Sequence, residues 1–328
     1  MDRRTFLALL ASGLVARPPV AHAQSPGRVY RVGMLMPTTR SDASERRTAV
    51  TLVPRFLAEL GYAQGRNLVL EPRWAGGNLD RLPALARELI QLRMDVIVAV
   101  GSAAVRACGG ASSTLPIVFC GNFDPIALGL VKSLAKPGGN VTGVLIAPAG
   151  TLAGKKMELL KEAVRATRMA FLTHEDPGLA LQEKETQSAA TALGITLLLT
   201  RVRGNDYEGA FAAIAASRPE ALFVAATTFF MRDRKRIIDL AARHRLPAIY
   251  EWPEQVEDGG LMSYGSDLSG TTRRVAVYVD RILRGDQPGD LPVEQPAEFQ
   301  LAINLRTARA LGLALPPSLV ARADRVIE

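Results

Sequence analysis

Short apolar runs alternate with amphipathic segments along most of the chain. Residues 29–36 and 95–100 consist mainly of aliphatic side chains, as expected of strands, whereas residues 49–60 and 79–92 carry apolar side chains at helical spacing. The first of these helices is predicted to end at Gly61, because glycine is the usual residue after a helix. Strands separated by helices of about a dozen residues predict βαβ units and a parallel sheet.

The same order of elements occurs twice. Residues 68–118 and 197–249 each read as a strand, a Gly-Asn turn, a helix, a buried strand, small polar residues, a helix and a Leu-Pro strand. A helix closed by Leu60-Gly61-Tyr62 precedes the first copy, and one closed by Leu193-Gly194-Ile195 precedes the second. The similar spacing of the two copies predicts two similar α/β lobes in place of one large sheet.

Glycine and proline mark three places where the chain is expected to cross between the lobes: residues 137–143, 259–264 and 285–299. The predicted fold is therefore α/β, with two similar Rossmann-like lobes, each with a parallel sheet, joined by a multi-crossing hinge. Their expected limits are 28–143 with about 263–286 for the first lobe, and 144–262 with about 287–328 for the second.

The N-terminus has the pattern of an export signal. Arg3 and Arg4 precede the short apolar stretch 6–16, and Ala21-His22-Ala23 is a small-x-small cleavage site. We therefore expect a signal peptide over residues 1–23, cleaved after Ala23, the alternative being a buried N-terminal helix. The arginine pair also resembles the twin-arginine signal, which leaves the export route open. No apolar run reaches the roughly 18 residues that span a bilayer.

Charge and cysteine content change this picture little. The 328 residues carry a formal net charge of +8, dispersed along the chain except for the dense stretch Arg232–Arg236, which is interpreted as a solvated helix start. No nucleic-acid partner is predicted. Export would permit a disulfide between Cys108 and Cys120, but two buried thiols are favoured.

Known catalytic signatures are absent from the sequence. It lacks the zinc helix, the nucleophile elbow and the dinucleotide fingerprint, and Gly150–Lys156 departs from a P-loop and is interpreted as a helix start. Of the histidines beyond residue 23, His174 is expected on an exposed loop, with a cleft-facing position as the alternative. We therefore predict no enzyme activity, no metal site and no cofactor.

Polar and aromatic residues follow several predicted strands, where open α/β sheets bind ligands. Ser102 could offer its hydroxyl and free helix N–H groups to an anion, or serve only as an N-cap. Asp124 could pair with an amine, or cap the following helix. Thr227 occupies the corresponding place in the second copy and is followed by Phe229 and Phe230, one of which could be a core residue. The candidate ligand-binding residues are Ser102, Ala103, Asp124, Thr227, Phe229, Phe230, Tyr250 and Tyr264.

Three long stretches resemble a known family: residues 119–143, 259–265 and 291–319. They look like the ABC-transporter substrate-binding proteins of the tryptophan/phenylalanine-binding-protein-like family. The resemblance implies a type I periplasmic-binding-protein fold with a ligand between two lobes, and Ser102 and Ala103 match the place where such folds grip a carboxylate. This chain departs from the family pattern at His174–Pro177 and at Asn122–Pro125, two loops expected at the cleft.

The resemblance predicts a periplasmic, monomeric receptor that captures a small molecule, preferably an amino acid or other small carboxylate, and delivers it to an ABC permease in the inner membrane. Three alternatives stay open. An exported α/β enzyme could use the cleft, and a periplasmic sensor could dock to a signalling receptor. A LacI-like regulator would need an N-terminal helix-turn-helix, where this chain has its export signal.

Overall fold

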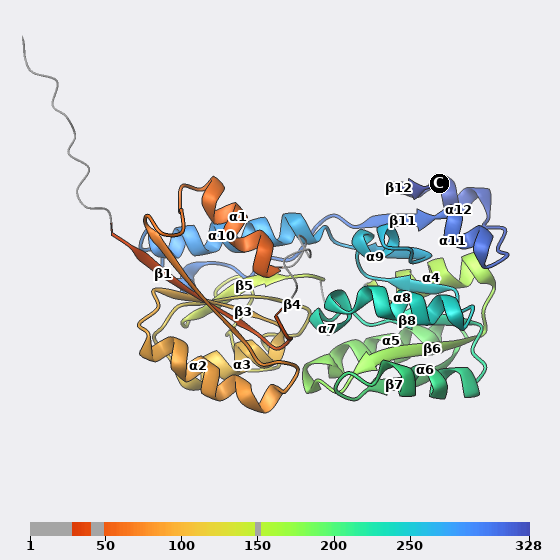
Figure 1. The fold of residues 1–328 in the computed structure, drawn as a ribbon, viewed down its shortest axis with the longest axis horizontal. Helices are drawn as coiled ribbons and strands as arrows, with labels where there is room; N and C mark the ends of the chain where they lie inside the picture. Colours follow the sequence, from red (N-terminus) through yellow and green to blue (C-terminus); the bar gives the residue numbers. More distant parts are fainter. Residues whose placement is uncertain (1–27, 41–48, 148–151) are drawn as a thin grey trace, which may run out of the picture.

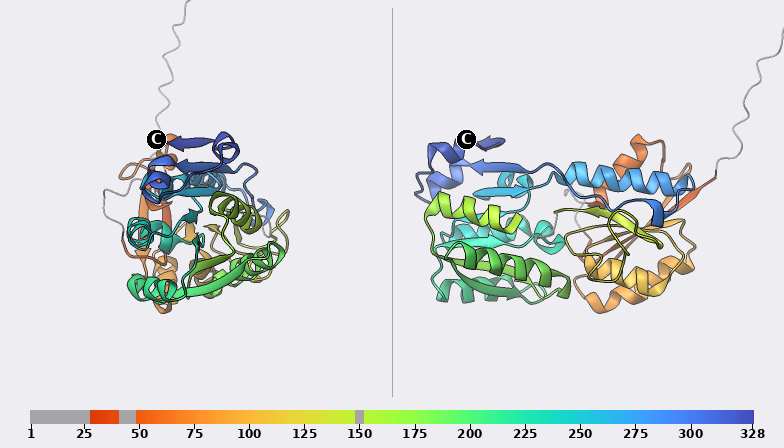
Figure 2. Two further views of the ribbon diagram at one scale, coloured as in Figure 1. Left: turned by 90° about the vertical axis from the view of Figure 1, so that its right-hand side faces the viewer. Right: turned by 180° about the vertical axis from the view of Figure 1, so that it is seen from behind.

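The computed structural model describes residues 28–40, 49–147 and 152–328. The predicted signal peptide lies outside the described residues. Two lobes lie side by side along the long axis of the molecule, and chain segments connect them on one side (Figures 1 and 2). Within the described ranges, no helix is long and apolar enough to cross a membrane.

The first lobe is built on a five-stranded parallel sheet of order β2-β1-β3-β4-β5. One face packs against α2 and α3, and the other packs against α1 and α10. Its elements are β1 (Tyr30–Met36), α1 (Ala49–Glu59), β2 (Leu68–Trp74), η1 (Leu79–Arg81), α2 (Leu82–Gln91), β3 (Val96–Val100), α3 (Ser102–Ala111), β4 (Ile117–Gly121), β5 (Val141–Leu145), α10 (Leu268–Leu283) and η3 (Pro288–Asp290).

The second lobe is built on a seven-stranded sheet of order β12-β11-β10-β9-β8-β6-β7, in which β10 and β11 form the antiparallel pair. Its elements are α4 (Leu152–Val164), β6 (Arg168–His174), η2 (Pro177–Leu179), α5 (Ala180–Ala192), β7 (Thr196–Val202), α6 (Tyr207–Ala216), β8 (Ala221–Val224), α7 (Thr228–Arg232), α8 (Arg234–Arg243), β9 (Ala248–Tyr250), α9 (Pro253–Glu257), β10 (Met262–Gly265), β11 (Gln300–Asn304), α11 (Leu305–Ala310), α12 (Pro317–Ala321) and β12 (Arg325–Ile327).

The predicted internal repeat is confirmed by the topology. The order β2-β1-β3-β4 of the first sheet recurs as β7-β6-β8-β9 in the second. The two Leu-Gly helix ends are also alike: Gly61 has φ 95° and Gly194 has φ 64°. In each, the next residue donates its N–H back into the helix, from Tyr62 to Leu57 at 2.9 Å and from Ile195 to Ala190 at 2.8 Å. This is the geometry that favours glycine after a helix.

The crossings define where the chain changes lobes. The second crossing follows β10, which still belongs to the second sheet, and leads into α10 of the first lobe. The chain then stays with the first sheet beyond residue 287, because Thr142 donates to the Leu291 carbonyl at 2.7 Å and Glu294 bridges to Val144. The third crossing therefore lies between Glu294 and β11.

Both cysteines are free and buried, which confirms the favoured interpretation of two thiols. Cys108 lies in the core between the first sheet and its α2–α3 layer, whereas Cys120 lies in the core on the α1–α10 side. The sheet therefore separates the two sulfur atoms.

Candidate functional site

The carboxyl ends of strands from both sheets meet at the junction of the lobes. Ser102 follows β3 in the first lobe, and its Oγ lies 3.5 Å from both carboxylate oxygens of Asp176, which follows β6 in the second lobe. Arg232 at the end of α7 donates from Nη1 to Thr39 Oγ1, after β1, at 2.9 Å. These contacts place the two lobes against each other across a closed cleft.

Ser102 reaches the second lobe because of the glycine before it. Gly101 has φ 82°, a backbone conformation that disfavours other residues, and it occupies the N-cap position of α3. Ser102 is thus the first residue of the helix and not its N-cap, and only 5% of its surface is exposed. Its hydroxyl points toward Asp176, so the simple N-cap role is not the one it has here.

The other two polar candidates have different surroundings. Thr227 is the N-cap residue of the short helix α7 and is buried, without a side-chain capping bond. Asp124 accepts backbone N–H bonds from Ile126 at 2.9 Å and Ala127 at 3.0 Å, as a capping carboxylate does. Ala103 is half-buried and lines a hollow of about 480 Å³ between α2, α3 and Asp176.

The aromatic candidates pack inside the second lobe in this closed form. Phe229 and Phe230 are buried, and Phe229 stacks parallel on His174 with ring centroids 4.0 Å apart. Tyr250 is buried too and lines a separate hollow, whose lining residues all belong to the second lobe. Tyr264 is half-buried, 6.0 Å from the Phe299 ring. The structure therefore does not bring these four candidates together at the cleft.

His174 is buried at the end of β6, so the sequence-based expectation of an exposed loop histidine was wrong. Its Nε2 lies 3.2 Å from the Gly204 carbonyl oxygen, and its Nδ1 is buried without a hydrogen-bond partner. Burial lowers the pKa of the imidazole below its ordinary value, against the opposing effects of the Gly204 carbonyl and of Asp176 and Glu175.

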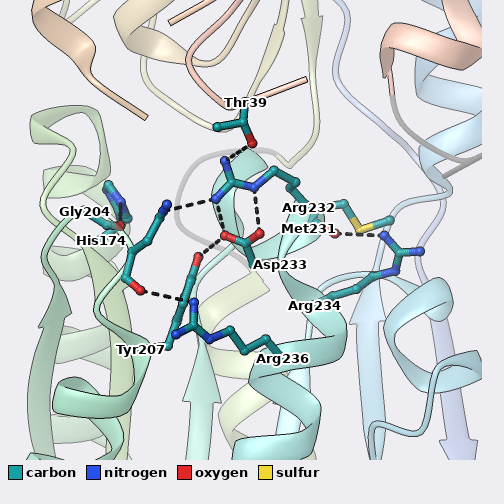
Figure 3. Close-up of polar contacts among 10 residues, drawn as sticks. Thr39, His174, Gly204, Tyr207, Met231, Arg232, Asp233, Arg234 and Arg236 are labelled. Carbon is teal, nitrogen blue, oxygen red and sulfur yellow. Dashed lines mark hydrogen bonds and ion pairs between the residues drawn. The ribbon is translucent and has the colours of Figure 1, made fainter. Parts of the chain in front are cut away.

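Arg232 and Arg234 also differ from the expectation of a solvated helix start, because only 9% of each side chain is exposed. Figure 3 shows Arg232 at the centre of a polar cluster, facing Asp233 with two of its nitrogen atoms. Tyr207 donates to the same carboxylate at 2.6 Å. Burial, reinforced by Asp233, raises the pKa of the Tyr207 phenol, which therefore stays a donor.

Within the described residues α4 begins at Leu152, so residues 152–156 are helical as predicted, and residues 148–151 lie outside the described part. Lys156 in this helix is buried, and its Nζ lies 2.7 Å from Glu251 Oε2, just after β9. The ammonium also lies 4.6 Å from the centre of the Phe223 ring. The other Glu251 oxygen, Oε1, is buried without a partner. Sequence spacing gave no signal for this pair.

An apolar cluster spans the junction and was missed by the sequence analysis. Ala226, Met231 and Trp252 of the second lobe belong to the same buried cluster as first-lobe residues such as Met36 and Val100. The indole N–H of Trp252 is buried and unpartnered. Trp252 lies two residues after the end of β9, and this place near a strand end is the sequence signal that could have identified it.

Two similar α/β lobes, three crossings and strand ends that meet in a cleft define a type I periplasmic-binding-protein fold. Residues 46–327 match the model of the ABC transporter substrate binding protein family, and the chain belongs to this family. Its members bind a solute outside the cytoplasm and present it to a membrane permease, so a solute-binding role is established at this level.

Individual relatives agree with this assignment. The chain is 23% identical over 272 residues to the tyrosine-binding protein of Clostridioides difficile strain R20291, which covers 79% of this chain and 75% of the relative. It superposes with a TM-score of 0.80 on a Streptococcus pneumonia ABC domain in complex with L-Trp, at 23% identity, covering 91% of this chain and 100% of the other.

A further solved structure is the ligand-free, open form of a substrate-binding protein with adhesive properties from Clostridium difficile. Its TM-score to this chain is 0.61, at 21% identity, covering 91% of this chain and 99% of the other.

Proposed function

We propose that this chain is the solute receptor of an ABC importer that captures a small carboxylate, in the first place an amino acid, between its lobes. The observation that carries the proposal is the buried Ser102 hydroxyl at the start of α3, held at the lobe junction by Gly101. A helix start offers free N–H groups and a favourable field to an anion. The relatives that bind L-Trp and tyrosine support the same class of ligand.

The apolar part of the ligand would contact the cluster of Ala226, Met231 and Trp252. The unpartnered indole N–H of Trp252 would then gain an acceptor. Ala103, Asp124, Thr227, Phe229, Phe230, Tyr250 and Tyr264 stay candidates for ligand contact, and those that are buried inside the second lobe would need the lobe to rearrange. Cleavage after Ala23, a monomeric state, delivery to an inner-membrane permease and the absence of turnover are parts of the same proposal.

The experiment combines native mass spectrometry of the purified mature protein with calorimetric titration of L-tryptophan, L-tyrosine, L-phenylalanine and benzoate. We expect one bound small carboxylate per chain, and Ser102→Ala should weaken its binding about ten-fold, equivalent to about 1.4 kcal/mol. The matched control is Ser188→Ala on the exposed side of α5, which should bind normally. Unchanged affinity in Ser102→Ala, or turnover of the bound molecule, would overturn the proposal.

A further inference from the structure

The cleft has a polar contact at its rim that is separate from the apolar cluster. Arg232 Nη1 of the second lobe donates to Thr39 Oγ1 of the first lobe at 2.9 Å, and Figure 3 shows the guanidinium reaching toward Thr39. Thr39 is exposed, whereas Met231 beside Arg232 is buried in the cluster that spans the lobes. Helix α7 thus presents Met231 to the interior of the junction and Arg232 to its rim.

The guanidinium is held in place by its own lobe. Two N–H groups of Arg232 bind the Asp233 carboxylate: Nε donates to Oδ1 at 2.7 Å, and Nη2 donates to Oδ2. Nη2 also donates to Asn205 Oδ1 at 3.2 Å. Tyr207 fixes the same carboxylate from the other side. None of these partners belongs to the first lobe, so opening the cleft would leave the position of Arg232 unchanged.

This arrangement suits a contact that forms only on closure. Asp233 neutralises the guanidinium, so closing the lobes buries no unpaired charge. Because Arg232 is already oriented, little side-chain entropy is lost when Thr39 arrives. Thr39 supplies a neutral acceptor, and a hydrogen bond with one charged partner is stronger than one between neutral groups.

We propose that Arg232 is a positioning residue for ligand capture, which sets the lifetime of the closed cleft through Thr39 without touching the ligand. The rim contact, defined as the Arg232–Thr39 hydrogen bond, exists in the closed state and not in the open one. It therefore shifts the equilibrium toward closure, and its loss should appear in the ligand dissociation rate more than in the association rate. The part of this inference that concerns ligand rates rests on the proposed function, whereas the part that concerns closure does not.

The test measures the distance between the lobes by double electron–electron resonance. Spin labels are attached through Gln91→Cys on α2 and Ser188→Cys on α5, which are both exposed positions. The native thiols can stay in place because both are buried. The proteins compared are the parent, Thr39→Val, which removes the acceptor at similar size, and Thr39→Ser, which retains it. Each is measured alone and with L-tryptophan or L-tyrosine.

We expect Thr39→Val to lower the ratio of closed to open molecules about ten-fold, with Thr39→Ser close to the parent. Where an amino acid binds, its dissociation rate should rise by the same factor in Thr39→Val, and its association rate should change less than two-fold. Arg232→Met should have a similar effect on closure, and adding Thr39→Val to it should cause little further change. A merely structural role of Arg232 would predict additive effects, with melting temperature altered by Arg232→Met alone.

Equal closed fractions in the parent and Thr39→Val would overturn the proposal. A parent protein that stays open both alone and with either amino acid would also overturn it, because the rim contact would then not stabilise a closed state. If Thr39→Val changes closure and neither amino acid binds, the rim contact stands and the proposed ligand class fails. If an amino acid binds and closure is insensitive to Thr39, the proposed ligand class stands and the proposal for the rim contact fails.

Discussion

Gly178 of η2 and Ser102 of α3 touch across the lobe junction, at a place where only glycine fits. A Cβ atom added to Gly178 would lie 1.7 Å from Ser102 Oγ and 2.5 Å from Ser102 Cβ. Rotation of the hydroxyl could relieve the first overlap but not the second. The closed cleft therefore requires glycine at position 178 in the second lobe, because a larger residue would overlap Ser102 of the first lobe.

Gly178→Ala should prevent full closure while leaving each lobe folded, because the backbone of Gly178 is not in the left-handed region. We expect the affinity for an amino acid to fall ten-fold or more and the radius of gyration with ligand to stay that of the open form. Calorimetry and small-angle scattering measure the two quantities.

Gly110→Ala is the control for this substitution. Gly110 lies on the exposed side of α3 with open space around it, so alanine there should raise the stability by about 0.5–1 kcal/mol and leave closure intact. In Gly178→Ala, the additional change Ser102→Gly should restore compaction, since it removes both clashing atoms. A compact, tightly binding Gly178→Ala protein would show that the junction is not as close in solution.

The fold could be predicted because its signals are local. Helical and strand periodicity, and the two Leu-Gly helix ends, lie within a few residues of the structures they specify. Gly61 and Gly194 both adopt the positive φ that the repeat implies. The repeat then required two lobes, which the order of strands confirms.

The details of the site could not be predicted, because they depend on partners distant in sequence. Lys156 is buried only because Glu251, 95 positions away, meets its charge. Arg232 of the second lobe donates to Thr39 of the first lobe, which is 193 positions away in the sequence. A single sequence shows charge density at residues 232–236 but not which carboxylate neutralises it. Strand ends identify the edge of a sheet, whereas the direction of a side chain such as that of Tyr250 depends on the packing of the whole lobe.

Cys108 and Cys120 should not react with thiol reagents in the native protein. Burial raises the pKa of both Cys108 and Cys120 from 9.0 to about 12. A thiol reagent at pH 8 should therefore find no reactive group in the folded chain and two in the chain unfolded by guanidinium, with the same count before and after reduction. Fast labelling of the native protein would contradict this.

The same shifts make stability depend on alkaline pH. Since the folded pKa of each thiol is raised above its unfolded value, its contribution is complete below about pH 9 and is lost as the pH rises toward 12. Replacing Cys120 by Ala should remove that share of the alkaline loss, as measured by urea denaturation at pH 8 and pH 10.5. An identical pH dependence in both proteins would exclude Cys120 as a contributor.

Removing only one partner of the Lys156–Glu251 ion pair should strongly lower the free energy of unfolding. Both side chains are almost completely buried, so Glu251→Ala leaves an unpaired ammonium and should destabilise the protein by about 3–5 kcal/mol. The double change Lys156→Met with Glu251→Leu removes both charges and should cost much less. Chemical denaturation of the three proteins measures the difference, and additive losses in the double variant would mean that the two charges do not compensate each other.

His174 should make the second lobe sensitive to acid. Burial lowers the pKa of its imidazole from the ordinary 6.5, so folding favours the neutral ring, which stacks on Phe229. A depressed folded pKa contributes stability that is complete above about pH 6.5 and is lost as the pH falls through the folded value.

In His174→Gln this contribution is absent, while His244 and the carboxylates are shared with the parent. The parent should therefore exceed His174→Gln in stability by about 1–2 kcal/mol at pH 7.5, for the lost ring contact and hydrogen bond, and the difference should shrink between pH 6.5 and pH 4.5. Urea denaturation across this range gives the difference, and NMR titration of the imidazole gives the pKa directly. A difference that does not change with pH, or a His174 pKa at or above 6.5, would mean that the ring is accessible to water and that the closed packing around β6 and α7 is looser than described.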